Sequence, residues 1–314
     1  MTASESIATE SIATVRVPAS AANVGGGFDC VGIAVDRWLT VSVRRGAGGQ
    51  SEPEFVREGT LASLGTRDTQ DAIYVAFRAA AGAKKVAVPE RLRFHATSEI
   101  PVGRGLGSSA AAFVAGAALA NEVLKLGLDK FGIAEIGTAL EGHPDNVCPS
   151  VFGGATLALT HAGKVIVSPL DVHPSLAFVF AVPEFVLETK RARAALPNVV
   201  PHVTAVSAAA KGAALVRGLA TADEAMLAAA LDDVLHIPHR RRLVRGYDAV
   251  VAAAIDAGAI GATLSGAGSS MLAVTKAEKA EAVGAAMARA WQLTGVTAVA
   301  FTSAQRVKGF HIVA

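Results

Sequence analysis

The 314-residue sequence is poor in several features that mark whole classes of protein. It has two cysteines, Cys30 and Cys148, which are too few for a disulfide framework and show no CxxC spacing. Charged residues make up 18% of the chain and the formal net charge is +2, so neither nucleic acid nor a membrane surface is the expected partner. These features favour a reducing, cytoplasmic setting.

Long apolar runs are also missing. No window of about 18 uninterrupted apolar residues occurs, so we predict no transmembrane span. The N-terminal segment lacks a basic start and an apolar core, and therefore does not resemble a secretory signal. It repeats the letters SIAT at 6–9 and 11–14, and residues 1–13 are predicted to form a flexible tail.

The glycine-rich stretch PVGRGLGSSAAAFVAGAALANEVLKL, residues 101–126, also has no lysine directly after its glycines. A serine follows the glycines at 103, 105 and 107, where a Walker A loop needs lysine, and the GxGxG spacing differs from the dinucleotide fingerprint GxGxxG. Such a loop still suits phosphate, because its backbone N–H groups and the following helix N-terminus attract anions. Of Ser108 and Ser109, one can cap the helix and the other can reach a metal or a phosphate. On the residues alone, a tight turn with a serine cap is the alternative.

The length and the 52% hydrophobic content predict about two domains. Strand patterns followed by helical patterns in both halves, without strict alternation, predict an α+β protein of two sandwiches. We expect a tail at 1–13, a first domain at 14–165 and a second domain at 166–314.

Periodicity and turn residues predict the elements of each half. In the first half they are strands at 14–35 (turning at 25–27), 38–45 and 91–100, a loop at 46–54, and helices at 69–82 and 108–126. In the second half they are a hairpin at 151–170, a buried strand at 176–183, helices at 202–219, 221–235 and 246–257, a glycine turn in 262–275 and a closing strand at 297–305.

Three motifs, in this order along the chain, resemble those of the GHMP kinases, a family that includes galactokinase and mevalonate kinase. VPASAANVGGGFDCVGIAV (17–35) is similar to the family's first motif, PVGRGLGSSAA (101–111) to its central signature, and GATLSGAGSSMLAV (261–274) to its third. The resemblance implies a ribosomal-S5-domain-2-like α/β sandwich followed by a ferredoxin-like α/β sandwich. It also implies ATP as the phosphoryl donor, with Mg²⁺.

Four segments resemble the members of the family that phosphorylate homoserine: SAANVGGGFD (20–29), EGHPDN (141–146), ETKRARAALP (188–197) and LHIPHRRRLVRGYD (235–248). The resemblance implies transfer of the γ-phosphoryl group of ATP to the side-chain hydroxyl of L-homoserine. The products would be O-phospho-L-homoserine and ADP, in threonine biosynthesis. A homodimer is also implied.

The same resemblance assigns residues to tasks. Those for the amino-acid substrate are Asn23, Asp29, Asn146, Arg193 and Arg240. Those for ATP are Pro101, Val102, Gly103, Arg104, Gly105, Leu106, Gly107, Ser108, Ser109, Ala110 and Ala111, with Asp71 at the position that contacts adenine. Ser109 and Glu141 would hold Mg²⁺, and Gly266 and Gly268 form the glycine turn of the second domain. Arginine forks suit a carboxylate, and a hydroxyl with a carboxylate suits Mg²⁺.

Two roles are open for Asp29, general base or acceptor that orients the substrate hydroxyl. An aspartate near Mg²⁺ and phosphates tends to stay ionised and is then a weak base, so we favour orientation. His143 can donate to a phosphate or make a structural hydrogen bond.

The chain departs from the family pattern where Asp71 replaces an asparagine, since a carboxylate cannot donate hydrogen bonds as an amide does. Ser269 and Gly26 also stand where proline is common.

Two alternative functions remain: a GHMP kinase for another small alcohol, and a catalytically silent paralogue that binds a ligand. Turnover of Mg-ATP with a panel of alcohols separates them.

Overall fold

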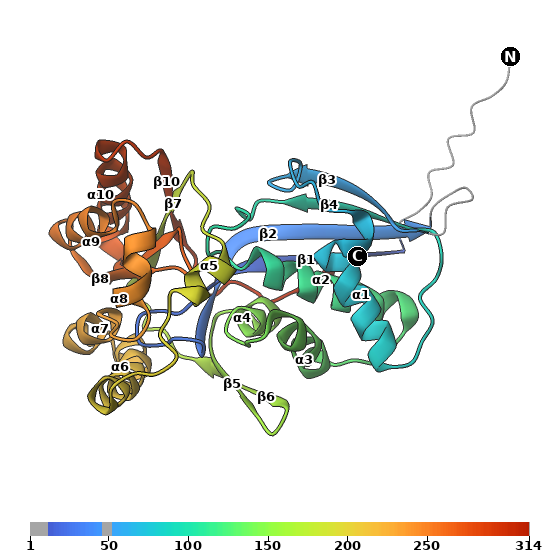
Figure 1. Cartoon of the computed structure of the whole chain (residues 1–314), viewed down its shortest axis with the longest axis horizontal. Helices are drawn as coiled ribbons and strands as arrows, with labels where there is room; N and C mark the ends of the chain where they lie inside the picture. Colours follow the sequence, from blue (N-terminus) through green and yellow to red (C-terminus); the bar gives the residue numbers. More distant parts are fainter. Residues whose placement is uncertain (1–11, 46–51, 314) are drawn as a thin grey trace, which may run out of the picture.

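The computed structural model describes residues 12–45 and 52–313, and its two halves lie side by side along the long axis (Figure 1). The first half contains a seven-stranded sheet with the order β11-β1-β2-β4-β3, in which β5 also pairs with β2 and with β6. β3 and β4 are parallel, and the other pairs are antiparallel. The strands are β1 (Ala13–Ala22), β2 (Val31–Arg45), β3 (Glu54–Gly59), β4 (Leu92–Ser98), β5 (Ala155–His161), β6 (Lys164–Leu170) and β11 (His311–Val313).

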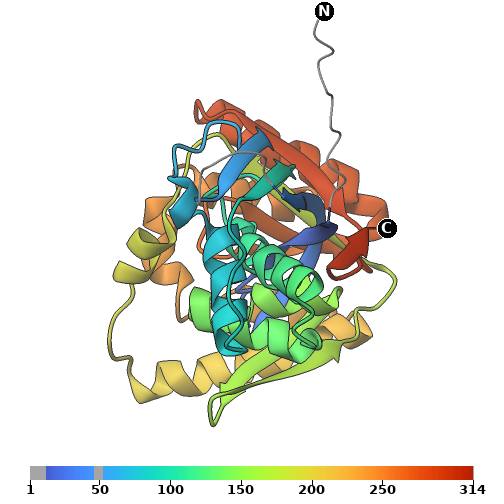
Figure 2. The same ribbon diagram turned by 90° about the vertical axis from the view of Figure 1, so that its right-hand side faces the viewer.

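Helices pack against this sheet, with α2 and α4 on β1 and β2, and with α1 and α3 against α2 (Figure 2). They are α1 (Ala72–Ala83), α2 (Ser108–Leu124), α3 (Lys130–Glu141) and α4 (Val147–Phe152), and a short 3₁₀ turn, η1 (Asp68–Gln70), precedes α1. The small residues of α2 let α1 approach closely, because a Cβ atom on Gly116 would lie 2.0 Å from the carbonyl oxygen of Ile73. The small-residue helix predicted at 108–126 is therefore a central packing element.

The second half is built on an antiparallel sheet with the order β10-β7-β9-β8. Its strands are β7 (Leu176–Pro183), β8 (Ala259–Leu264), β9 (Met271–Lys276) and β10 (Ala298–Ser303). Its helices are α5 (Thr189–Ala194), α6 (His202–Thr221), α7 (Glu224–Leu231), α8 (Ile237–Arg240), α9 (Tyr247–Asp256) and α10 (Ala280–Leu293), with 3₁₀ turns η2 (Arg241–Leu243) and η3 (Ala277–Lys279). Helices join β7 to β8 and β9 to β10, which is the ferredoxin-like arrangement. The α+β class is therefore confirmed.

Sheet pairing divides the chain differently from the expected domains. The expected boundary at 165/166 falls inside β6, which stays in the first sheet because it pairs with β5 along its whole length. The last strand, β11, returns to the first sheet and pairs with β1. The predicted domain limits therefore do not describe β6 and β11, which both belong to the sheet of the first half. For the rest of the chain the limits stay a prediction. Residues 1–11 of the expected tail and 46–51 of the expected loop lie outside the described residues, and β1 already begins at Ala13.

Several elements differ from the prediction. β2 is one continuous strand from Val31, where two pieces were predicted, because its pairing with β1 continues across a register shift at Pro18/Ala19. The helix predicted at 221–235 ends at Leu231. α10 and β3 were not predicted.

Among the described residues, α6 is the one helix long and apolar enough to cross a membrane by length and composition. About 17% of its apolar window is buried inside the structure. It packs on α7, and Lys211 Nζ donates a 2.7 Å hydrogen bond to the carbonyl oxygen of Ala229 there. A single such helix is weak evidence of a transmembrane span. That the chain has no transmembrane span therefore stays a prediction.

Candidate active site

The glycine loop between β4 and α2 has the backbone that its sequence predicts. Gly103, Gly105 and Gly107 all have positive φ, between 64° and 72°. Gly107 is the N-cap of α2, and no side chain caps the helix. The predicted serine cap is therefore wrong, because the αL conformation of Gly107 ends the loop and the Ser109 hydroxyl bonds elsewhere. Uncapped N–H groups at a helix start suit an anion.

The glycine turn of the second half holds this loop in place. Ser265 Oγ donates to the Gly105 carbonyl oxygen at 2.7 Å, and the Ser270 N–H donates to the Arg104 carbonyl oxygen at 3.2 Å. The Gly266 N–H donates at 2.8 Å to the carbonyl oxygen of Ala22, which ends β1. One turn thus connects the first and central motifs.

The two residues expected to hold Mg²⁺ meet across α2 and α3. Ser109 Oγ, in the first turn of α2, donates to Glu141 Oε1 at 2.8 Å, at the end of α3. Burial raises the pKa of the Glu141 carboxyl above its usual value, against the opposing effect of the Ser109 hydrogen bond. A partly buried carboxylate beside a hydroxyl is a hard-oxygen pair, and such a pair fits Mg²⁺.

The segment after α3 places three polar side chains at the site. His143 Nδ1 bonds to Asp145 Oδ1, which also accepts the Asn146 N–H at 2.8 Å, and Ser20 Oγ donates to Asn146 Oδ1 at 3.0 Å. Burial lowers the pKa of His143, but the hydrogen bond and charge of Asp145 outweigh it, so the pKa lies above its ordinary value. The structural bond of His143, which the sequence left open, is thus present.

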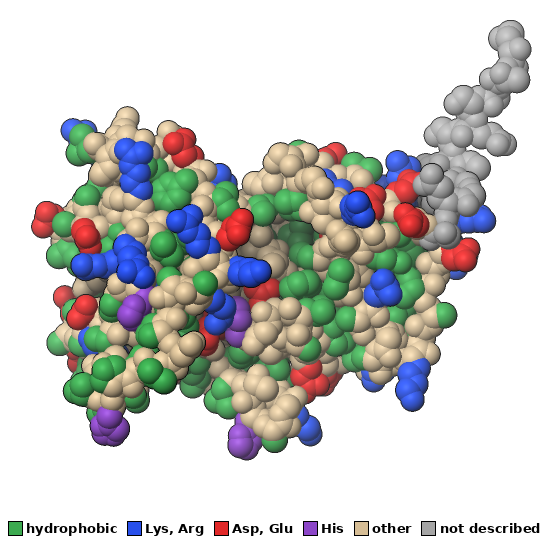
Figure 3. Space-filling view, in the orientation of Figure 1, with side chains coloured by type: hydrophobic (Ala, Val, Ile, Leu, Met, Phe, Trp, Pro, Cys, Tyr) green, Lys and Arg blue, Asp and Glu red, His purple; other side chains and the backbone are tan. Residues whose placement is uncertain are grey.

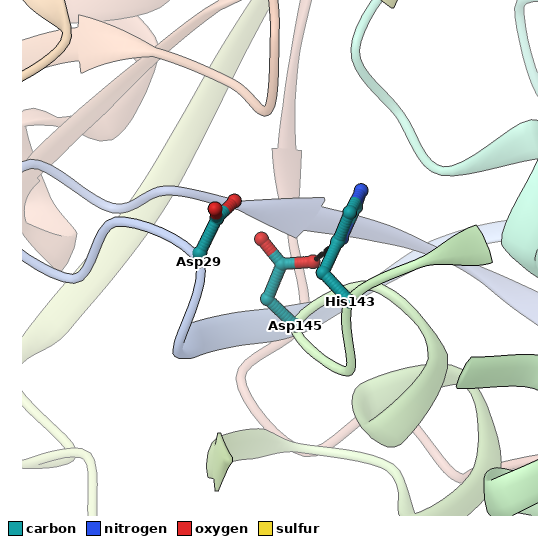
Figure 4. Close-up of side chains that lie close together, drawn as sticks. All are labelled: Asp29, His143 and Asp145. Carbon is teal, nitrogen blue, oxygen red and sulfur yellow. Dashed lines mark hydrogen bonds and ion pairs between the residues drawn. The ribbon is translucent and has the colours of Figure 1, made fainter. Parts of the chain in front are cut away.

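Asp145 is a site residue that the sequence reasoning missed. It is fully buried, and its Oδ2 atom has no hydrogen-bond partner in the structure. Figure 4 shows Asp145 between Asp29 and His143, with one oxygen bonded to His143 and the other on the side of Asp29. Its signal in the sequence was a second carboxylate in EGHPDN, next to the assigned Asn146.

The first motif supplies Asn23 and Asp29 from one tight loop. Both residues have positive φ, and Asn23 Oδ1 accepts the Asp29 N–H at 2.8 Å. Both carboxylate oxygens of Asp29 meet the guanidinium group of Arg193 on α5, at 2.8 and 3.3 Å. The structure therefore brings a residue of the first half against a residue of the second.

Arg240, at the end of α8, is 1% exposed. Its Nε donates to the Ala192 carbonyl oxygen at 3.3 Å, and its Nη1 is buried with no hydrogen-bond partner in the described part of the chain. Burial, and then the charge of Arg193, lower the pKa of Arg240 to about 10. The guanidinium group stays charged at neutral pH and needs an anion.

Most of these groups line a cavity of about 240 Å³ at the junction of the halves, although Asp29 and Asp145 are not part of its lining. Charged side chains also gather on the surface at this junction (Figure 3). The cavity lining includes seven of the expected loop residues and six other expected ones. The full lining is Asn23, Val102, Gly103, Gly105, Leu106, Gly107, Ser108, Ser109, Glu141, His143, Asn146, Thr189, Arg193, Arg240, Gly266 and Ala267.

The expected residues Asp29, Pro101, Arg104, Ala110, Ala111 and Gly268 do not line the cavity. Ala110 and Ala111 are buried core residues of α2, and Arg104 Nη2 donates to the Glu184 carbonyl oxygen at 2.6 Å. Asp29 borders the site through Arg193.

Asp71, expected at the adenine, is also away from the lining. Its Oδ1 caps α1 by accepting the Ile73 N–H at 3.0 Å, and its Oδ2 pairs with Arg57 at 2.9 Å. Both oxygens are thus engaged within the first half, and an adenine contact by Asp71 stays a prediction.

Comparisons with known proteins agree with the motifs. The family model for the GHMP kinases N terminal domain matches residues 71–154, and that for the GHMP kinases C terminal domain matches residues 210–293. A protein named homoserine kinase from Gloeobacter violaceus is 42% identical over 88% of this chain and 92% of its own length. Another of that name from Picosynechococcus is 38% identical, covering 91% and 94% of the two chains.

Solved structures show the same relationship. The crystal structure of homoserine kinase from Cytophaga hutchinsonii superposes with a TM-score of 0.85 at 27% identity and covers 100% of both chains. Mevalonate kinase from L. major in complex with R-mevalonate shares the fold, with a TM-score of 0.67 at 15% identity over 96% of this chain and 100% of its own. The chain belongs to the GHMP kinase family.

Proposed function

We propose that the protein transfers the γ-phosphoryl group of ATP to the side-chain hydroxyl of L-homoserine, giving O-phospho-L-homoserine and ADP. The observation that carries the proposal is a set of two arginines and two carboxylates beside the glycine loop: Arg193 pairs with Asp29, whereas Arg240 Nη1 and Asp145 Oδ2 have no hydrogen-bond partner among the described residues. Homoserine is a zwitterion with an alcohol, and this set of charges complements both of its charged groups. Relatives named homoserine kinase, at 38–42% identity over most of the chain, support the same substrate.

Arg193 and Arg240 are proposed to bind the substrate carboxylate, since both residues line the cavity. Asp29 and the unpartnered Oδ2 of Asp145 are proposed to accept hydrogen bonds from the ammonium group. The zwitterion would then replace the Arg193–Asp29 ion pair charge for charge. This exchange limits the cost of opening that pair.

Asn23 and Asn146 are proposed to contact the substrate hydroxyl, because both line the cavity next to the glycine loop. The backbone N–H groups of residues 103–109 and the start of α2 would bind the ATP phosphates. Ser109 and Glu141 would hold Mg²⁺, which neutralises charge on the phosphates when bound.

In the transfer, the homoserine hydroxyl oxygen forms a bond to the γ-phosphorus while the bond from that phosphorus to the β–γ bridging oxygen breaks. The leaving oxygen departs with ADP, and the hydroxyl proton passes to solvent water. Asp29 is proposed to orient the hydroxyl as an acceptor, once the substrate carboxylate has replaced Asp29 at the Arg193 guanidinium group. Positioning and electrostatic stabilisation then supply most of the rate.

Coupled ADP release with purified protein, ATP and Mg²⁺ tests the proposal. We expect turnover with L-homoserine, and only background rates with L-threonine, mevalonate, shikimate or no acceptor. Turnover with mevalonate or shikimate instead would assign a different alcohol. ATP binding without turnover of any acceptor would indicate a silent paralogue.

The setting of the reaction follows from the same resemblance. We propose a cytoplasmic homodimer in threonine biosynthesis that requires neither nucleic acid nor a membrane. Sedimentation velocity of the purified protein tests the oligomeric state.

A further inference from the structure

Phe28 connects the first-motif loop to the segment that carries Arg240. It precedes Asp29, and its ring centroid lies 5.2 Å from Arg240 Cζ. The same ring stacks on His236, with centroids 5.0 Å apart and an interplanar angle of 23°. His236 and Arg240 are four residues apart, so Phe28 spans one helical turn at α8.

Arg240 has few other groups to fix its orientation. Among residues 12–45 and 52–313, no carboxylate lies within 4.0 Å of its guanidinium nitrogens, and its hydrogen bond to Ala192 uses Nε alone. Its Nη1 has no partner. Stacking on an aromatic ring fixes the plane of a guanidinium group while leaving its outward N–H groups available.

His236 is itself held firmly. Its backbone N–H donates to Asp233 Oδ2 at 2.6 Å, and the Ile237 N–H donates to the same oxygen at 2.8 Å. Burial, against the opposing charge of Asp233, lowers the pKa of His236 to about 4, so the ring is neutral and does not repel Arg240. Asp233 thus fixes the start of α8, and the His236 ring supports Phe28.

We infer that Phe28 is a positioning residue that holds the Arg240 guanidinium group toward the carboxylate of the substrate. The inference rests on the proposed function, because it assigns that carboxylate to Arg240. Phe28 does not line the cavity, so it would act on substrate through Arg240 alone. It would therefore contribute to selection of an amino acid over a simple alcohol.

Phe28→Leu tests this inference with substrate fragments. We expect the KM for L-homoserine to rise about tenfold, with kcat and the KM for ATP within about twofold. 4-Hydroxybutanoate keeps the carboxylate and lacks the ammonium, whereas 3-amino-1-propanol keeps the ammonium and lacks the carboxylate. Both are measured as competitive inhibitors. In the variant, the inhibition constant of 4-hydroxybutanoate should rise together with the KM for homoserine, whereas that of 3-amino-1-propanol should stay the same.

Two further variants separate positioning from folding. Phe28→Tyr retains the stacking ring and should restore the KM for homoserine. Phe131→Leu removes an exposed ring of α3 and should leave all constants unchanged. Melting temperatures of all variants monitor folding.

Equal weakening of both fragments, or a matching rise in the KM for ATP, would overturn the inference, as would a Tyr variant no better than Leu. If the variants gave these contradicting results while the wild-type enzyme phosphorylated homoserine, the inference about Phe28 would fail and the proposed function would stand. A wild-type enzyme inactive on homoserine would overturn both.

Discussion

Asp29 and Asp145 are two carboxylates at one site with different surroundings. Asp29 is half-buried and pairs through both oxygens with Arg193, whereas Asp145 is fully buried and has one oxygen without a partner. The motif letters assigned Asp29 correctly to the neighbourhood of Arg193 and Asn23. They could not show that Asp145 turns toward Asp29, because that depends on the bond of His143 across a tight turn.

Asp29→Asn distinguishes the two roles of this residue. An asparagine keeps an acceptor oxygen for the hydroxyl but loses the charge that pairs with Arg193. We expect kcat to fall about tenfold, which is less than the 10²- to 10⁴-fold that a general base contributes. Single-turnover kinetics with saturating ATP and homoserine measure the effect. A loss beyond about 10³-fold would instead make Asp29 the base.

Local sequence patterns predicted the loop and α2 well, because glycine spacing and helix periodicity act over a few residues. β3 and β11 were beyond such reasoning. β3 is an edge strand with half-exposed residues and no clear alternation, and the three residues of β11 pair with β1, about 300 residues earlier in the chain. Pairing over that distance leaves no local signal.

Gly105→Ala tests whether the glycine loop depends on contact with the glycine turn. A Cβ atom at Gly105 would lie 2.0 Å from the Ser265 carbonyl oxygen, in a residue with φ of +72°. We expect a loss of about 2 to 4 kcal/mol in the free energy of unfolding and a higher KM for ATP. Urea denaturation and ATP titration of the initial rate measure both.

Gly127→Ala is the matched control. Gly127 also has positive φ, at +66°, but apart from its chain neighbours no heavy atom of residues 12–45 and 52–313 lies within 4 Å of a Cβ atom there. This variant should lose about 1 kcal/mol through backbone strain, with an unchanged KM for ATP. Equal effects of the two variants would show that strain alone matters and that the turn contact does not.

In the whole molecule, the site exists because the halves interlock. The first-motif loop lies against the second half, where a Cβ atom on Gly25 would be 2.4 Å from the Ala230 carbonyl oxygen and the Gly26 N–H donates to that oxygen at 2.8 Å. The glycine at 26, which replaces the usual proline, thus supplies a donor that proline lacks. The sequence showed the substitution but not its partner, since the partner lies about 200 residues away.

The interlock should make stability depend on pH through His236, which is buried between Phe28 of the first half and α8 of the second. Its folded-state pKa of about 4 lies below the ordinary value of 6.5, because burial outweighs the charge of Asp233. The charge of Arg240 also lowers this pKa, and the charge of Asp29 opposes the decrease. Between these pH values the unfolded chain binds more protons than the folded one. The stability contribution is therefore complete above pH 6.5 and is lost as the pH falls toward 4.

His236→Phe keeps a planar ring against Phe28 and removes the titrating group. In the wild type, we expect this histidine to make the free energy of unfolding up to about 2 kcal/mol smaller at pH 5 than at pH 7.5. The variant should lose that part of the pH dependence, as measured by urea denaturation at both pH values. His202→Phe, at the exposed start of α6, should keep the wild-type difference. If His236→Phe also keeps it, the acid sensitivity arises elsewhere and protonation of His236 does not affect the stability of the interlocked halves.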